Sequence, residues 1–322
     1  MSDIHVFIEH FQGKVADISF ICLAQAKEIA GKSGSKVVAV LMGDKVELLS
    51  KNLLADEVLM VEQDALKELN YKAYVTALTQ IMKEKKPALV LLGDTSIGSD
   101  LAGGLSFRTG LPLVSFCKEI LVDGGLTFVA QICNGKIYVQ GKLPGDGVIV
   151  TLLPGRFKPE NGQSSTSPTV TKYPVPQLDS GGVLMKEVIL PSGDDLDISK
   201  EKILVAVGRG IENEDNVGLA QELADALGGV LCASRPVVDQ GWVPTTRLVG
   251  KSGKTVKPKL YLAMGISGAP EHVEAIGQSE LIIAVNTDPK APIFDYARYG
   301  TTEDLMDVTE ELIRSIEELK GG

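Results

Sequence analysis

The chain has 322 residues, of which 44% are hydrophobic, 23% charged and 5% aromatic, and its formal net charge is −10. This length suits two domains with a core each, and the composition is that of a soluble globular protein. The negative charge and scarce aromatics disfavour binding to nucleic acid or to an anionic membrane surface. No apolar run reaches the ~20 residues of a membrane span, and the N-terminus lacks the basic start of a signal peptide. We therefore expect no membrane insertion and a cytoplasmic protein.

Strand and helix patterns alternate through the first half of the chain. Short apolar runs predict buried strands, and apolar residues at helical spacing predict the helices between them. This alternation predicts a mostly parallel sheet with right-handed crossovers. The predicted strands are 4–9, 36–42, 57–61, 88–92 and an antiparallel pair, 127–133 and 136–140; the predicted helices are 15–30, 45–54, 71–84 and 100–109.

The alternation stops and then restarts in the second half. Residues 154–168 form a loop rich in Pro, Gly and Ser, residues 169–190 are expected to contain one or two strands, and the polar stretch 192–195 is the best linker. We place the domain boundary there, with residues 1–193 and 194–322 each forming an α/β domain: a mostly parallel open sheet with helices on both faces. In the second domain the predicted strands are 202–207, 230–233, 260–264 and 281–285, and the predicted helices are 217–227 and 303–319.

The stretch from Leu260 to His272 carries the most informative motif. Its apolar run ends in a glycine turn that includes Ser267-Gly268-Ala269, and Pro270-Glu271 suits the first turn of a helix. The N–H groups of such a turn point at one spot and can bind phosphate. The next strand ends at Asn286, so two polar turns share the carboxyl edge of the sheet, where open α/β sheets bind their ligands.

Several alternatives stay open from these residues alone. Glycine-rich turns follow the strands of any doubly wound protein, and most of them bind nothing. The run Gly265-Ile266-Ser267-Gly268-Ala269 approximates the nucleophile elbow of a hydrolase, but alanine replaces its last glycine. Gly208-Arg209-Gly210 begins like the motif of an NAD-dependent oxidoreductase, but the third glycine is missing. A nucleotide-binding subunit without a redox role would share these turns. The four scattered cysteines lack metal-site spacing, so we expect no metal.

A combination of polar residues after the predicted strands gives the C-terminal half a family resemblance. The C-terminal half resembles the alpha subunit of electron transfer flavoproteins. The resemblance is carried by Arg209, Ser234-Arg235, the 249–253 loop, the Ser267–His272 turn and Asn286. The runs 260–269 and 286–294 and the pair Asp304-Leu305 match the family signature. The resemblance covers the whole chain but is specific mainly in residues 200–310.

The resemblance implies a function as well as a fold. Residues 194–322 would be a Rossmann-like domain that binds FAD, and residues 1–193 would contact an electron transfer flavoprotein beta subunit in a heterodimer. The chain would shuttle electrons between a flavin dehydrogenase, of the acyl-CoA dehydrogenase type, and another redox partner; a bifurcating system is one setting for it. It would be an electron carrier without catalytic residues of its own, because the flavin carries the chemistry.

The resemblance also assigns these residues places along FAD. Arg209, the Ser267-Gly268-Ala269 turn and Asn286 would face the pyrophosphate, and Asp304 and Leu305 would lie by the adenosine end. The fixed charge of Arg235 and the hydroxyl of Ser252 suit an anionic reduced flavin. The residues implied around the flavin ring are Ser234, Arg235, Val249, Lys251, Ser252, Glu271 and His272, with Gly250, Gly253 and Pro270 in the same cofactor-binding segments.

Several positions depart from the family pattern, including Ser99 and Gly103-Gly104, which stand where the family often has arginines. Lys251-Ser252 stands where the family usually has Gln-Thr, and Pro270-Glu271 stands where it usually has Ile-Gln. Lys251 and Glu271 therefore add opposite charges in place of neutral residues. We expect these two side chains to form a compensating pair beside the flavin, and the family's usual potential does not carry over to this chain.

Overall fold

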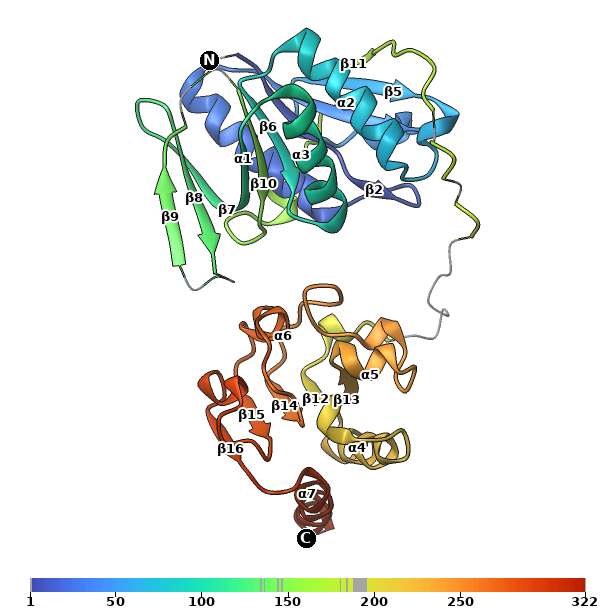
Figure 1. Cartoon of the computed structure of the whole chain (residues 1–322), viewed down its shortest axis with the longest axis vertical. Coiled ribbons are helices and arrows are strands. Elements are labelled where there is room, and N and C mark those ends of the chain that lie inside the picture. Colours follow the sequence, from blue (N-terminus) through green and yellow to red (C-terminus); the bar gives the residue numbers. More distant parts are fainter. Residues whose placement is uncertain are drawn as a thin grey trace. The chain divides into compact units, whose positions relative to one another are not determined.

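A computed structural model describes residues 2–321 of the chain, apart from residues 134, 136, 144, 146, 180, 184 and 188–195. The chain divides into two units, residues 1–188 and 189–322 (Figure 1). The predicted boundary between residues 193 and 194 lies outside the described residues and stays a prediction. In the described parts, every helix is too short or too polar to cross a membrane.

In its described residues, the first unit is built around a nine-stranded sheet (Figure 1). Its strands are β1 (Ile4–Phe7), β4 (Val37–Gly43), β5 (Glu57–Glu62), β6 (Leu89–Gly93), β7 (Leu113–Val122), β8 (Leu126–Ile132), β9 (Ile137–Gly141), β10 (Val148–Leu152) and β11 (Thr169–Lys172). Their order is β11-β5-β4-β1-β6-β10-β7-β8-β9, parallel as far as β7 and antiparallel beyond it. The predicted mixed sheet is confirmed, although β7 and β10 are absent from the predicted strands. A small hairpin, β2 (His10–Phe11) and β3 (Lys14–Val15), lies outside it.

Helices cover both faces of this sheet. They are α1 (Asp17–Ser33), α2 (Tyr71–Lys85) and α3 (Ser96–Thr109), which confirms the helices predicted at 15–30, 71–84 and 100–109. Side chains alternate along β4, so Leu41 packs in the core formed with α1 while Met42 packs in the core formed with α2 and α3. Burial on both faces explains why the strand reads as one continuous apolar run.

The predicted helix at residues 45–54 is wrong, because only a short 3-10 turn, Glu47–Ser50, forms there. The Leu54 N–H donates to the Gly162 carbonyl at 3.0 Å, so this segment is paired with a distant loop. That pairing uses backbone groups that a helix would need for its own hydrogen bonds. Tertiary contacts thus outweigh the local helical pattern.

The described residues of the second unit form a five-stranded, fully parallel sheet in the order β13-β12-β14-β15-β16. This order confirms the predicted open sheet, and helices lie on both of its faces. Its elements are β12 (Ile203–Val207), α4 (Asp215–Leu227), β13 (Val230–Ala233), α5 (Arg235–Asp239), β14 (Leu260–Met264), α6 (Pro270–Ile276), β15 (Ile282–Val285), β16 (Tyr299–Thr301) and α7 (Leu305–Gly321).

Each face of the second sheet has its own core. Along β12, Leu204 and Ala206 belong to the core that includes α6, whereas Val205 and Val207 belong to the core that includes α4 and α7.

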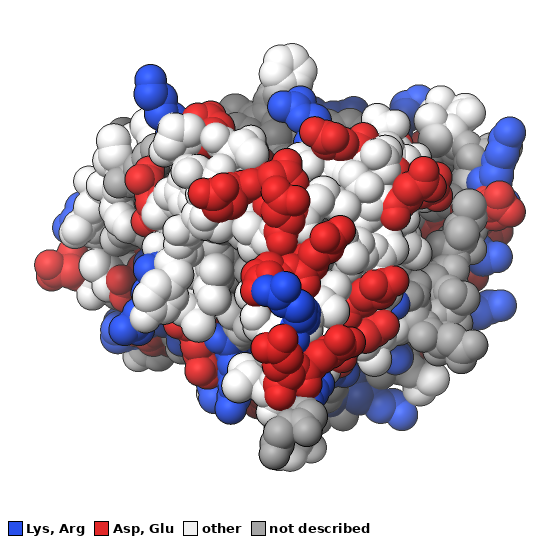
Figure 2. All heavy atoms as spheres, turned by 90° about the horizontal axis from the view of Figure 1, so that it is seen from below, with Lys and Arg blue, Asp and Glu red and all other residues white. Residues whose placement is uncertain are grey.

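Exposed carboxylates of α4 and α7 contribute to the acidic surface in Figure 2. This face is therefore unsuited to nucleic acid or to an anionic membrane surface.

Candidate functional site

Neighbouring strands of the second unit end in the polar turns that the sequence singled out. The strand order β13-β12-β14-β15 places Ser234-Arg235, Arg209, the 265–269 turn and Asn286 at one carboxyl edge. Asp304 and Leu305 follow β16 at the start of α7. Residues spread over about a hundred positions thus come together, because parallel strands all end at the same edge.

The glycine turns after β12 and β14 contact each other backbone to backbone. The Gly208 N–H donates to the Met264 carbonyl at 2.8 Å, and the Gly210 N–H donates to the Gly265 carbonyl at 3.1 Å. A Cβ at Gly208 would lie 2.3 Å from the Gly265 oxygen, and Gly265 itself has φ +65°. These glycines are therefore required by packing between the two turns, independently of any ligand.

Asn286 ties the turn after β14 to the turn after β15. Its Nδ2 donates to the Ile266 carbonyl at 2.9 Å, and its Oδ1 accepts from the Asp288 N–H at 2.9 Å. Gly268, at φ +84°, leaves room for Ile293, since a Cβ would lie 2.4 Å from the Ile293 nitrogen. The amide of Asn286 thus shapes the turn that exposes Ser267 and Ala269.

Arg235 and Ser252 lie side by side although they are distant in sequence. Arg235, at the exposed start of α5, donates from Nη1 to Ser252 Oγ at 3.2 Å. Its Nε also pairs with Asp239 Oδ2 at 3.3 Å, a partner that the sequence analysis missed and that the i, i+4 spacing could have indicated. Ser234 is buried, and its N–H donates to the Val207 carbonyl at 3.0 Å.

The loop that carries Lys251 and Ser252 is held between β13 and α6. The Val249 N–H donates to the Ala233 carbonyl at 2.9 Å, and the Lys251 N–H donates to the Glu271 carbonyl at 2.8 Å. Lys251 and Glu271 are thus joined through the backbone, and both residues are exposed. Their action as a compensating charge pair stays a prediction.

His272 differs from the exposed Arg235 and Ser252 because its ring is buried. Burial lowers the pKa of His272 to about 4, so the ring is neutral at pH 7. Its Nε2 lies 2.8 Å from Tyr261 Oη, inside the core. The hydrolase alternative gains no support, since this histidine is bonded to Tyr261 rather than to Ser267.

The chemistry of the edge suits an anionic cofactor. Arg209, Arg235 and Lys251 are exposed cations there, and Ser252 and Ser267 supply exposed hydroxyls. Guanidinium groups bind phosphate oxygens, and cations near a flavin ring favour added negative charge. These donors fit FAD, whose pyrophosphate is anionic and whose ring becomes more negative on reduction.

A cavity of about 310 Å³ lies elsewhere in the second unit. Its lining includes Val217 and Gly218 of α4, Leu231 of β13, Trp242 and Arg247. None of its lining residues belongs to the predicted cofactor site. The candidate site is therefore defined by the strand-end turns and not by this cavity.

Comparison with known proteins agrees with the geometry of the two units. Residues 4–178 match the family model of the electron transfer flavoprotein domain, and residues 197–277 match that of the electron transfer flavoprotein FAD-binding domain. The predicted cofactor, FAD, is thereby confirmed. Asn286, Asp304 and Leu305 lie beyond the second matched range.

Curated relatives match over nearly the full length of the chain. An electron transfer flavoprotein subunit alpha of Thermoanaerobacterium thermosaccharolyticum is 36% identical, covering 99% of this chain and 98% of the relative. The acryloyl-CoA reductase electron transfer subunit beta of Anaerotignum propionicum is 35% identical, covering 99% and 96%. Protein FixB of Clostridium saccharobutylicum is 35% identical, covering 98% and 96%. The chain therefore belongs to the electron transfer flavoprotein family, as an alpha subunit.

Proposed function

We propose that this chain is the FAD-carrying subunit of a heterodimer that passes electrons between a flavin dehydrogenase and a second redox partner. The observation that carries the proposal is the pairing of Arg235 with Ser252 at the strand ends of a domain matched to an FAD-binding family. Bound FAD supplies the redox chemistry, so the chain needs no catalytic base of its own.

Different exposed groups at this edge bind different parts of FAD. Arg209 and the Ser267–Ala269 turn bind the pyrophosphate, because a guanidinium matches the geometry of phosphate oxygens. Arg235 and Ser252 orient the flavin ring, and the guanidinium favours negative charge on it. Asp304, ahead of α7, lies by the adenosine end. Supporting this division, the strand order β13-β12-β14-β15 brings these turns to one edge.

A beta-type subunit closes the site in this proposal. Most of the residues assigned to FAD follow strands of one sheet, and the 249–253 loop is bonded to β13 of that sheet through Val249. Together they supply one wall, whereas ligand sites usually enclose most of their ligand. Alpha subunits of this family pair with a beta subunit, which supports the same arrangement. Residues 194–322 hold FAD, and residues 1–193 contact the partner.

The name of one relative supports the class of redox partner. The relative from Anaerotignum propionicum is an electron transfer subunit of an acryloyl-CoA reductase. A dehydrogenase of the acyl-CoA type is therefore the proposed donor or acceptor for this chain as well.

Expression of the chain alone and together with a beta subunit tests the proposal. We expect a yellow heterodimer with stoichiometric FAD after gel filtration, while the chain alone loses FAD on repeated dilution. A second FAD in each heterodimer would indicate a bifurcating system. A colourless heterodimer would contradict the role as FAD carrier, and a monomer that keeps stoichiometric FAD would contradict the need for a partner.

A further inference from the structure

The cavity of about 310 Å³ in the second unit has the composition of a small-molecule site. Its apolar lining includes Val217 of α4, Leu231 of β13 and Val243 in the segment that follows α5. Small-molecule sites have volumes of about 300–1,000 Å³ and combine an apolar lining with a few polar groups. The cavity is therefore large enough for a small ligand, and its polar groups decide which one.

Arg247 brings a positive charge to this lining. Its Nη1 donates to the Leu231 carbonyl at 3.2 Å, which anchors the half-buried side chain to β13, the edge strand of the sheet. Among the described residues, no ion pair joins this guanidinium to a carboxylate. A bond to one neutral carbonyl leaves its charge uncompensated and several of its N–H donors available. The cavity therefore offers a cation to an anionic ligand.

Trp242 adds a large apolar surface and a further donor. Its side chain lines the cavity and is half-buried. Within the described part of the chain, its indole N–H has no hydrogen-bond partner. An indole combines an apolar body with a polar N–H group that can donate to a ligand. Trp242 can thus contact both the apolar and the polar part of a bound molecule.

Gly218 opens the cavity on the side of α4. Glycine within a helix destabilises it relative to alanine, and Gly218 lies within α4. A Cβ at this position would have no packing neighbour within 4 Å, so the packing of the protein does not require glycine there. Gly208 is different, because its Cβ would lie 2.3 Å from the Gly265 oxygen. The missing side chain of Gly218 leaves space at the cavity for another molecule.

We propose that this cavity is a second ligand site of the chain and binds a small carboxylate with an apolar body. Arg247 binds the carboxylate group, since a guanidinium matches the geometry of carboxylate oxygens. Trp242, Val217 and Leu231 contact the apolar body, whose removal from water favours binding. The site shares no residue with the FAD edge and does not depend on the proposed electron transfer.

The charges around the cavity favour an anion over a cation. Gln221, a lining residue on α4, donates from Nε2 to Asp225 Oδ1 at 2.8 Å, so one carboxylate lies next to the cavity. Asp225 is exposed, whereas Arg247 is half-buried. Water and salt therefore screen the charge of Asp225 more than the charge of Arg247.

Saturation-transfer NMR of the full chain with hexanoate as the probe tests the proposal. We expect a dissociation constant of about 1 mM or below, and a saturable change in the fluorescence of Trp242, the chain's single tryptophan. Acetate lacks the apolar body and hexanamide lacks the charge, so each should bind about tenfold more weakly or less. Hexylammonium, with the opposite charge, should not bind. Absence of saturable hexanoate binding, or equal binding of hexanamide or hexylammonium, would overturn the proposal.

Two variants locate the binding in this cavity. Arg247→Gln should weaken hexanoate binding by about tenfold or more, because it removes a charge-assisted contact. Arg314→Gln makes the same change of charge on α7, outside the cavity lining, and should leave the affinity unchanged. Gly218→Leu should fill the cavity and abolish binding while raising the urea midpoint of the Trp242 transition, since leucine favours a helix more than glycine does. Unchanged hexanoate affinity in folded Arg247→Gln or in Gly218→Leu would refute the assignment of the site.

Discussion

Arg235 and His272 both lie near the candidate flavin edge, but they differ in solvent exposure and therefore in the partners that they can bind. Arg235 is exposed, and its guanidinium reaches Ser252 and Asp239. His272 is buried, bonded to Tyr261, and neutral at pH 7 because burial lowers its pKa. Solvent access thus leaves one side chain available to a ligand and commits the other to the core.

Arg235→Ala is expected to weaken FAD binding in the heterodimer by about tenfold or more, since it removes a charge-assisted contact. FAD release followed by flavin fluorescence measures the change. Asp239→Asn is the control, because it breaks the ion pair of Arg235 without removing the guanidinium. Equal FAD affinity in Arg235→Ala and the unaltered heterodimer would refute the role given to Arg235.

The buried ring of His272 makes stability depend on pH. Its pKa is about 4 in the folded chain against an ordinary value of 6.5. Between these values the unfolded chain binds more protons, so the free energy of unfolding falls as the pH is lowered from 6.5 towards 4. The slope contributed by one such group is at most about 1.4 kcal/mol per pH unit.

Urea unfolding at a series of pH values, followed by the fluorescence of the chain's single tryptophan, Trp242, measures this slope in the second unit. His272→Gln should reduce it. His5→Gln is the control, since burial also lowers the pKa of His5 to about 4 but this residue lies in the first unit. If the free energy of unfolding depends on pH with the same slope in His272→Gln and in the unaltered chain, the pH dependence does not come from His272.

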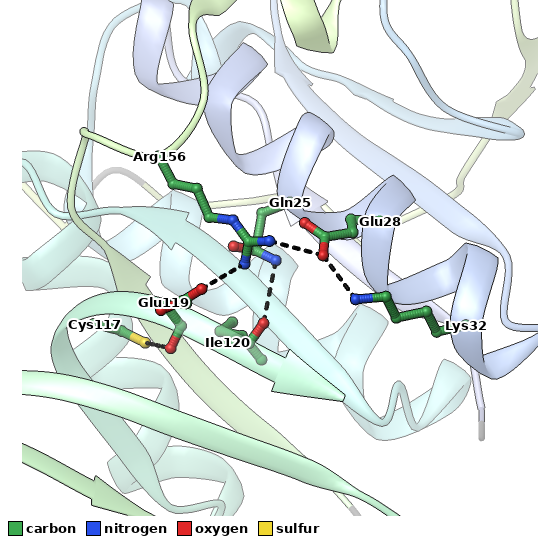
Figure 3. Close-up of polar contacts among 7 residues, drawn as sticks. All are labelled: Gln25, Glu28, Lys32, Cys117, Glu119, Ile120 and Arg156. Atoms are coloured by element: carbon green, nitrogen blue, oxygen red, sulfur yellow. Dashed lines mark hydrogen bonds and ion pairs between the residues drawn. The ribbon is translucent and has the colours of Figure 1, made fainter. Parts of the chain in front are cut away.

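At the scale of elements, Arg156 connects a helix to a strand in the first unit. Its Nη2 lies 2.9 Å from Glu28 of α1, and its Nη1 lies 2.9 Å from Glu119 of β7 (Figure 3). Lys32 also donates to Glu28 at 2.9 Å, and this bond and the charge of Arg156 help to lower the pKa of Glu28. The loop after β10 is thereby joined to both elements.

Arg156→Ala is expected to lower the free energy of unfolding of the first unit by about 1 kcal/mol, because it breaks two partly exposed ion pairs at once. Urea unfolding followed by circular dichroism measures the loss. Lys72→Ala is a matched control that breaks a single ion pair, with Asp179, which is more exposed to solvent than the pairs of Arg156. It should leave the free energy of unfolding almost unchanged. Equal losses in both variants would mean that the Arg156 network adds nothing.

At the scale of the whole molecule, each unit has its own sheet with a hydrophobic core on either face. Leu41 lies in a core of the first unit and Leu204 in a core of the second, and both are 0% exposed. Separate cores let each unit respond to its own mutations. The acidic surface in Figure 2 includes carboxylates of the second unit, on α4 and α7.

Leu204→Ala is expected to destabilise the second unit by about 2–5 kcal/mol, because it leaves a cavity in a closed core. The unfolding transition reported by Trp242 fluorescence should shift accordingly. Leu41→Ala makes the same change in the first unit and should leave that transition in place. Equal shifts of the Trp242 transition in the two variants would show that the units unfold as one.

Much of the fold could be predicted because buried parallel strands and amphipathic helices have local signatures. β14 follows from an apolar run that ends at Gly265, and α7 from an apolar stripe that includes Leu305 and Leu312. The failure at 45–54 has a different origin, since Leu54 pairs with Gly162, more than a hundred residues away. Local periodicity carries no information about such a partner.

The sequence by itself determined which residue types follow each strand, and so the candidates Arg209, Ser234-Arg235 and Asn286. Only the tertiary structure decided which of their turns are neighbours, because strand order depends on long-range pairing. It also decided that Gly265 serves contact between two turns and that His272 faces Tyr261. A turn can be read from neighbouring residues in the chain, but burial and hydrogen-bond partners exist only once distant segments pack together.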